Sequence, residues 1–347
     1  MDQTYYINSG PMGFPTEEKS TMTVLRGHAI FSVKVEIARV KDTRFGRELL
    51  QQTKLCRGCL FGRYGSLRGP IDLLYQHCLP LLERLAPQTS LQDLSLECFL
   101  HAPTYHLEPV DACVNEDIRI EGEDECFYMP SFAISPMRTA DLPESCKVIP
   151  HFQARKTWIA PTRDEGNSID SVQGKVITAE GVLMYFKPRI EGRESEFERE
   201  LLIMLHIDKA GLRARIRVPG LQGIVVSGEN GETTMGMLMT LITSTITGTH
   251  LQSQGFQGKL ELHKKWEEQV TAIVQELHAN GIVWGDVNPM NVVIDEAMNA
   301  WVIDFGGMNN VEFVDDEKRE TVEGDKQGIM RLFQEWLPSR LKLPGKD

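Results

Sequence analysis

The sequence predicts an α+β protein whose C-terminal part has two lobes, and three features predict it. Residues 147–242 contain short apolar runs of strand length, interrupted by one segment with helical spacing at 195–207. Residues 249–347 show mostly helical spacing, apart from one short pair of strands. Strands followed by helices is the order of an α+β bilobal domain. We therefore expect a small β-rich N-lobe over about 147–242 and a short helical C-lobe over about 249–347, preceded by an α/β N-terminal extension.

The length and composition divide the chain into three parts. A chain of 347 residues has room for more than one domain. Residues 1–20 are rich in Gly, Pro and polar residues, which predicts a flexible N-terminus. An acidic stretch at 115–125 and a Pro-containing segment at 129–145 predict a boundary or linker. The expected domains are an α+β region of unknown role over 21–145 and a C-terminal domain over 146–347.

Four segments of the N-terminal region have recognisable patterns. Residues 29–40 alternate apolar and polar side chains, which predicts a half-buried strand. The Gly-rich, basic stretch 54–69 is typical of a loop, and apolar residues at helical spacing predict a helix over 71–85. Alternation of Leu94, Leu96, Cys98 and Leu100 predicts a further strand.

The C-terminal region is expected to begin with strands. One helix at 195–207 has its apolar side chains on one face. A β-hairpin is expected where the apolar runs Val292–Ile294 and Trp301–Ile303 flank a turn-prone acidic piece. The other predicted strands cover residues 147–152, 157–160, 174–178, 181–187, 220–228 and 234–242.

Composition and charge exclude several functions. Lys and Arg total 37 against 49 Asp and Glu, a net charge of −12, which opposes a broad nucleic-acid-binding surface. The longest near-apolar run, 235–246, is too short to span a bilayer, and the first residues lack the pattern of a signal peptide. Seven cysteines do not form a disulfide pattern, and the pair Cys56 and Cys59 is expected to be ordinary thiols. We expect a cytoplasmic or otherwise intracellular protein with neither nucleic acid nor membrane as a partner.

Three polar residues are expected to meet at one end of the predicted hairpin. Asp286 and Asn291 precede its first strand, and Asp304 follows its second strand. A carboxylate and an amide oxygen are suitable ligands for Mg²⁺, which prefers hard oxygen atoms. A second carboxylate nearby can orient or deprotonate an attacking hydroxyl group. The spacing therefore predicts a site for a metal and a nucleotide.

The order of these residues resembles a known catalytic pattern. Asp286, four residues and Asn291, followed by Asp304–Phe305–Gly306, resemble the catalytic loop and metal-binding triplet of the protein-kinase-like superfamily. This resemblance implies that Asp286 is the catalytic base and that Asn291 and Asp304 bind Mg²⁺ beside ATP.

Residues on either side of this pattern extend the resemblance. Lys187 ends a predicted strand, as does the family lysine that contacts the α- and β-phosphates of ATP. Glu200 lies at the edge of the apolar face of helix 195–207 and is expected to pair with Lys187, with Glu196 one turn earlier as the alternative. Asp325 resembles the family aspartate that braces the catalytic loop.

The chain also departs from the family pattern. No G-x-G-x-x-G precedes Lys187, and the corresponding segment 161–175 has only two glycines. Trp284–Gly285 stands where His–Arg is usual, and Asn288 stands where protein kinases usually have a lysine. These departures put the usual gripping of phosphate and the usual regulation by an arginine-bound phosphate in doubt.

The C-lobe is short for the family. Only 17 residues separate Gly307 from Asp325, which leaves no room for the usual activation segment and peptide-docking helices. The sequence segments VPGLQGIVVS, GIVWGD and IDFGG resemble those of atypical fungal kinase-like proteins with a short C-lobe. The resemblance covers 146–347 and leaves the first 140 residues unexplained.

The resemblance implies one function, and other interpretations stay open. The first is an ATP- and Mg²⁺-dependent phosphotransferase whose acceptor is a protein Ser/Thr or a small molecule. The second is an inactive pseudokinase, a nucleotide-dependent module whose N-terminal region binds a protein partner. A third is an ATPase without an acceptor.

Structural roles compete with each of these functional roles. Asp286, Asn291 and Asp304 are residue types that also cap turns around a hairpin. Glu200 on a helix surface and Lys187 at a strand end are commonly solvated, and Asp325 is also a residue type that caps helix N-termini.

Overall fold

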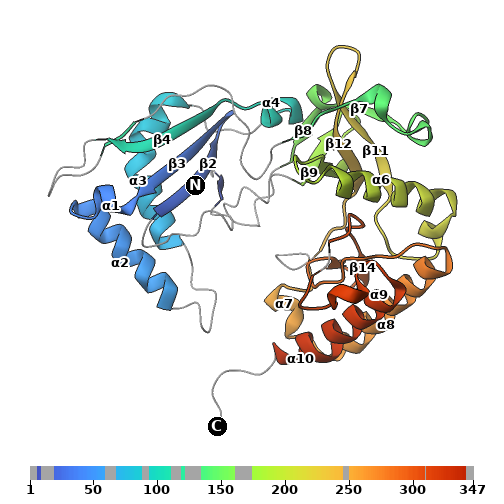
Figure 1. The fold of residues 1–347 in the computed structure, drawn as a ribbon. Helices are drawn as coiled ribbons and strands as arrows, with labels where there is room; N and C mark the ends of the chain where they lie inside the picture. The colour runs from blue at the N-terminus through green and yellow to red at the C-terminus, as the bar shows by residue number, and fades with distance from the viewer. Residues whose placement is uncertain are drawn as a thin grey trace, which may run out of the picture. The chain divides into compact units, whose positions relative to one another are not determined.

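The computed structural model shows a mixed α/β protein in two compact units. The first unit contains Met1–Ala133 and Ala154–Gly181, and the second contains Ile134–Gln153 and Val182–Asp347. None of the described helices combines the length and apolar character needed to cross a membrane. The structure describes residues 6–8, 19–58, 68–87, 94–110, 119–121, 134–160, 174–244, 250–308 and 310–340 (Figure 1).

The first unit contains a five-stranded sheet. Strands β3 and β4 are parallel, and the other neighbours are antiparallel. The connection between β2 and β3 is tight, and Gly27 there has a positive φ of 55°. The sheet order is β1 (Tyr6–Asn8), β2 (Lys19–Arg26), β3 (Ala29–Glu36), β4 (Thr104–Val110) and β5 (Arg119–Glu121).

Helices pack against one face of this sheet and form the core of the first unit. The buried side chains Phe31, Val33 and Val35 alternate along β3, which confirms the predicted strand over 29–36. Its expected continuation over 37–40 is wrong, because these residues form a short helix. They share one hydrophobic cluster with Phe45 and Leu49, which come from the neighbouring helix. The remaining elements of this unit are α1 (Ile37–Val40), α2 (Arg44–Gly58), α3 (Arg68–Leu85), α4 (Leu96–Leu100), a 3₁₀ segment (Ala154–Lys156) and the antiparallel strands β8 (Thr157–Ile159) and β9 (Lys175–Thr178).

Two further predictions for the first unit are wrong. Residues 94–100 do not form a strand, because Ser95 caps helix α4 by accepting a hydrogen bond from the Cys98 backbone N–H at 3.1 Å. Phe99, which interrupts the supposed alternation, is buried together with Leu96. The predicted loop 54–69 is wrong at both ends, because α2 continues to residue 58 and α3 begins at residue 68. Its middle, 59–67, lies outside the described residues.

The second unit begins with a mixed sheet, in which one pair of strands is parallel and the other pairs are antiparallel. The predicted strands over 181–187, 220–228 and 234–242 are confirmed, whereas the strand expected over 147–152 starts only at His151. Strand β10 alternates, with Met184 and Phe186 buried between more exposed neighbours. Along this sheet the order is β7 (His151–Gln153), β11 (Leu221–Ser227), β12 (Thr233–Thr240) and β10 (Leu183–Pro188), and β6 (Met137–Arg138) also pairs with β12.

Helices make up most of the rest of the second unit. Helix α6 (Glu194–Lys209) confirms the predicted helix and contacts β11 (Figure 1). The predicted hairpin is present as β13 (Val292–Ile294) and β14 (Ala300–Val302). The other helices are α7 (Gln254–Gln257), α8 (Leu260–Ala279), α9 (Val322–Met330), a π-helical segment (Arg331–Trp336) and α10 (Leu337–Ser339), with 3₁₀ segments at Thr139–Asp141, Glu144–Cys146, Leu212–Ala214 and Asp316–Lys318.

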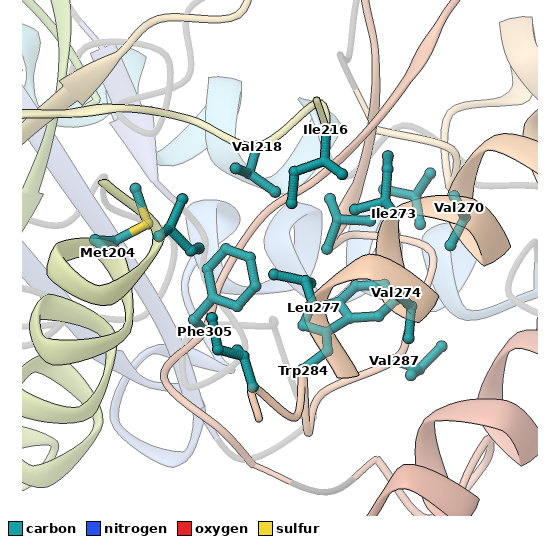
Figure 2. Packing of buried hydrophobic residues seen from close by; sticks show 14 of the residues in the cluster. Met204, Ile216, Val218, Val270, Ile273, Val274, Leu277, Trp284, Val287 and Phe305 are labelled. Carbon is teal, nitrogen blue, oxygen red and sulfur yellow. The ribbon is translucent and has the colours of Figure 1, made fainter. Parts of the chain in front are cut away.

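One hydrophobic cluster runs through the second unit and anchors two of its loops. Figure 2 shows Trp284 and Phe305 among the side chains of α8, with Met204 of α6 at one end of the cluster. Trp284 and Phe305 are fully buried. Each is close in sequence to a polar residue of the predicted site, Asp286 or Asp304. The core therefore fixes the backbone from which both aspartates project.

The buried face of α8 is expected to provide much of the stability of this unit. Replacing Leu277, which is 0% exposed, with alanine should lower the free energy of unfolding by about 2–5 kcal/mol. The matched change Leu260→Ala, in the same helix at a side chain that is 61% exposed, should change it by less than about 0.5 kcal/mol. Urea denaturation measures both, and equal losses would contradict the position of the core.

Candidate functional site

The β13–β14 hairpin brings the two ends of its strands together. Val292 pairs with Val302, and the next residue on the second strand, Ile303, donates its backbone N–H to the carbonyl of Asn291 at 3.1 Å. Asn291 and Asp304 therefore lie at the same end of the hairpin. This is the arrangement that the sequence predicts.

Asp286 and Asn291 form a direct side-chain pair. The amide nitrogen of Asn291 donates to Oδ2 of Asp286 at 2.7 Å and to its backbone carbonyl at 3.0 Å. Asn288 folds the loop between them, because its Oδ1 accepts the backbone N–H groups of Met290 at 2.9 Å and Asn291 at 3.2 Å. The amide oxygen of Asn291 is thus the atom left to bind a cation.

Lys187 connects the sheet, α6 and the hairpin. Its Nζ donates to Oε2 of Glu200 and, at 2.9 Å, to Oδ1 of Asp304. Glu200 is only 1% exposed, which excludes the solvated surface position considered for it. The structure therefore pairs Lys187 with Glu200, and the alternative Glu196 remains half-buried one turn earlier.

The charges of this group stabilise one another. Burial favours a neutral Lys187, but the carboxylates of Glu200 and Asp304 overcome this effect and raise the pKa of Lys187 above its ordinary value. Burial also opposes ionisation of Asp304, and the ammonium group of Lys187 outweighs it and lowers the pKa of Asp304. At neutral pH the pair is therefore an ammonium and a carboxylate.

Asp286 has the opposite shift. Burial raises the pKa of Asp286 to about 6, and the negative charge of Asp304 adds to the increase. Hydrogen bonds from Asn288 and Asn291 and the positive charge of Lys187 oppose it. A carboxyl group with a pKa near neutrality can both accept and release a proton. The influence of Lys187 and Asp304 on Asp286 also indicates that all these groups belong to one site.

Asp304 has an unusual backbone conformation. Its φ is +60°, in the left-handed region that non-glycine residues seldom adopt. The indole of Trp284 donates to its carbonyl at 3.2 Å, and its Oδ1 accepts the N–H of Gly306 at 3.2 Å. Such strain persists where surrounding contacts enforce it and is concentrated at functional sites.

Asp325 braces the segment that precedes Asp286. Its two carboxylate oxygens accept the backbone N–H groups of Trp284 and Gly285, each at 2.8 Å, and Oδ2 lies 2.7 Å from Nε2 of His278. The helix cap that we considered for Asp325 is instead Thr321, whose Oγ1 accepts the N–H of Gly324 at 3.0 Å. The role of Asp325 is therefore to hold this loop.

The donor set is compatible with Mg²⁺. The amide oxygen of Asn291 and Oδ2 of Asp304 are hard oxygen ligands at the same end of the hairpin. Within the described ranges, no group of three or more His, Cys, Asp or Glu side chains could hold a metal ion. Mg²⁺ commonly has one or two protein ligands and fills its shell with water and phosphate oxygens. Asn291 and Asp304 fit that kind of partial shell.

One residue of the site was not predicted. Arg199, next to Glu200 on α6, donates to the backbone carbonyls of Phe305 and, at 3.1 Å, Val283, and forms an ion pair with Glu320 at 2.7 Å. Its partners are distant in sequence, so no local pattern indicates them. The glycine-poor segment 161–175 was predicted to cover the phosphates, and all of it except its last two residues lies outside the described residues.

Neither the models of known protein families nor the curated proteins that we compared with this chain match it. Its function is therefore inferred from the geometry of the site.

Removing the carboxylate of Asp325 should destabilise the second unit. Asp325 is 2% exposed, so Asp325→Ala leaves two buried N–H groups without their acceptor, at a cost of about 2–5 kcal/mol. Asp325→Asn retains one acceptor oxygen and should lose less. Chemical denaturation of both variants tests this, and a loss below about 1 kcal/mol for alanine, the usual size for a helix cap, would contradict the bracing role.

The raised pKa of Asp286 predicts a pH-dependent stability. Because the folded pKa of about 6 exceeds the unfolded value of 3.8, the folded state binds more protons between these values. Stability contributed by this group is therefore highest at low pH and decreases as the pH rises through about 6. Asp286→Asn should raise Tm at pH 7.5 and not at pH 4. The exposed Asp42→Asn is the control, and a uniform shift at both pH values would refute the assignment.

Proposed function

We propose that the C-terminal domain is an ATP- and Mg²⁺-dependent phosphotransferase of the protein-kinase-like superfamily. It would transfer the γ-phosphoryl group of ATP to a hydroxyl of a protein Ser/Thr or a small molecule. The observation that carries this proposal is the amine of Lys187 held between Glu200 and Asp304, with Asp286 and Asn291 paired beside it. A hairpin with a purely structural role does not require a partly buried lysine contributed by another strand.

Lys187 is suited to bind phosphate oxygens. An ammonium group has three N–H donors, and Lys187 uses two of them on Glu200 and Asp304. In the proposed complex the remaining donor binds the nucleotide phosphates. Glu200 fixes the position of the amine, because its side chain is buried and is not free to move in solvent.

Asn291 and Asp304 would hold the metal through the oxygen atoms described above. When bound, Mg²⁺ neutralises charge on the phosphates and orients them for transfer. Asp304 is ionised at neutral pH, since Lys187 lowers its pKa despite burial. Its Oδ1 lies 2.9 Å from Nζ of Lys187, so in the proposed complex the two groups would act on one nucleotide.

Asp286 would position the acceptor hydroxyl and take up its proton. Asn291 holds one of its carboxylate oxygens at 2.7 Å, which limits rotation of the group. Its pKa of about 6 leaves it mainly ionised at physiological pH, so it can accept a proton. Positioning of this kind supplies much of the catalysis in phosphoryl transfer.

The order of elements supports the same proposal. A small, mostly antiparallel sheet with α6 precedes the helical part that contains α8 and the hairpin, as a β-rich N-lobe would precede a C-lobe. Between Gly307 and the start of α9 at Val322, the only regular element in the described residues is the 3₁₀ segment Asp316–Lys318. Because this segment is short, it does not choose between the two kinds of acceptor. It favours a hydroxyl on a small molecule or on an exposed Ser or Thr side chain of a protein.

A catalytically weak or inactive pseudokinase is the second candidate. Asn288, in place of the usual lysine, is bound within its own loop and carries no charge to offer the transferred phosphate. In that case the domain would bind a nucleotide and regulate a protein partner through the N-terminal region. The intact group of Lys187, Glu200 and Asp304 favours the enzyme.

Nucleotide binding and turnover together test the proposal. ATP with Mg²⁺ should raise Tm of the wild type, and labelled ATP should label an acceptor in a lysate fractionated into proteins and metabolites. Asp286→Asn should retain the Tm shift and lower turnover by about 10²–10⁴-fold. Lys187→Met and Asp304→Ala should reduce both, and Lys209→Met, at an exposed lysine of α6, is the matched control.

The outcomes separate the candidates. A Tm shift without turnover, persisting in Asp304→Ala, would support the binding module. Release of free phosphate that Asp286→Asn removes, with no labelled acceptor, would indicate an ATPase. If ATP with Mg²⁺ does not stabilise the wild type, both nucleotide-dependent functions are wrong.

A further inference from the structure

Arg199 joins α6 to both loops of the site. Its guanidinium donates to the carbonyl of Phe305, directly after Asp304. It also donates to Val283 at 3.1 Å and to Trp284 at 3.4 Å, in the segment before Asp286. These bonds attach one side chain of α6 to the backbones that carry both aspartates.

Glu320 holds the guanidinium in this position. Its Oε2 lies 2.7 Å from Arg199, and the two side chains are only partly exposed, at 27% for Arg199 and 39% for Glu320. Glu320 has a φ of +55°, an uncommon conformation for a residue with a side chain. The chain therefore accepts local strain at the residue that supplies the counter-charge.

Two glycines make room for this ion pair. A Cβ atom at Gly285 would lie 2.7 Å from Oε2 of Glu320 and 2.9 Å from Arg199, and one at Gly307 would lie 2.6 Å from Oε1 of Glu320. Both glycines have positive φ values, 83° and 76°. The ion pair thus packs directly on the turns beside Asp286 and Asp304, where a larger residue would displace it.

We propose that Arg199, held by Glu320, is the positioning residue that keeps α6 and the two aspartate loops in register for phosphoryl transfer. The inference rests on the proposed function and names how its site is assembled. Glu200 adjoins Arg199 on α6, so the bonds of Arg199 to the loop carbonyls set where Glu200 meets Lys187 and Asp304. The carboxylate of Glu320 supplies the counter-charge of the guanidinium from within the same chain.

The reactivity of Lys187 toward an acylating reagent measures this assembly without relying on catalysis. In the wild type, Lys187 is engaged by two carboxylates and should be labelled slowly, as measured by mass spectrometry. Arg199→Ala should increase its labelling at least about 5-fold, and Arg199→Lys should give an intermediate value. Glu320→Gln, which retains a hydrogen-bond acceptor, should have a smaller effect. Lys209 in the same samples is the internal reference.

Turnover separates positioning from a purely structural role. Arg199→Ala should lower kcat about 10-fold or more with a smaller change in KM for ATP, and Arg199→Lys should restore part of kcat. The exchanged pair Arg199→Glu with Glu320→Arg should not recover, because a glutamate at position 199 cannot donate to the carbonyls of Phe305 and Val283.

Each result has a definite consequence. Unchanged Lys187 labelling in Arg199→Lys and Glu320→Gln, together with wild-type kcat, would overturn the inference even if Arg199→Ala fails to fold. Full recovery in the exchanged pair would also overturn it, because the ion pair alone would then suffice. If the wild type has no turnover but Lys187 labelling rises as expected, the assembly role holds and the proposed function fails.

Discussion

The structure of the second unit depends on how it compensates the charge of Lys187. Removing an ammonium group from water costs several kcal/mol, and this cost is offset only when opposite charges are held close by. Glu200 from α6 and Asp304 from the hairpin loop supply them, so one lysine of β10 joins the helix that follows it to a loop 117 residues away. The same interaction that stabilises the fold therefore sets the distances within the site, and neither can change without the other.

The hydrophobic core and hydrogen bonds to the backbone hold the loops that carry the charged residues of the site. Trp284 packs in the cluster and donates its indole N–H to the carbonyls of Ile303 and Asp304, while Asp325 accepts the N–H groups on the other side of the same segment. Without these contacts, loops that contain glycine would be less well fixed in position. The buried tryptophan and aspartate allow Gly285 and Gly307 to turn sharply without giving the aspartates freedom to move.

Much of the second unit was predictable from the sequence because its signals are local. The apolar run that forms β10 and the apolar face of α6 placed Lys187 and Glu200, whose pairing the family resemblance implied, and the hairpin pattern brought Asp286, Asn291 and Asp304 to one end. The strand predicted over 94–100 was wrong for a local reason. The N-cap at Ser95 favours a helix, and this effect outweighed the alternation of apolar residues. Arg199 and Glu320 are 121 residues apart, and the other partners of Arg199 are backbone carbonyls, which no side-chain pattern in the sequence indicates.

The left-handed backbone of Asp304 ties the conformation of this loop to the contacts around it. A residue with a side chain loses about 1–3 kcal/mol in such a conformation, so the loop is held there only while its neighbours compensate. The ammonium group of Lys187 supplies one of these compensating contacts, through Oδ1 of Asp304, and comes from another strand of the unit. An uncommon backbone angle in one loop is therefore maintained by a charge that a distant segment of the chain provides.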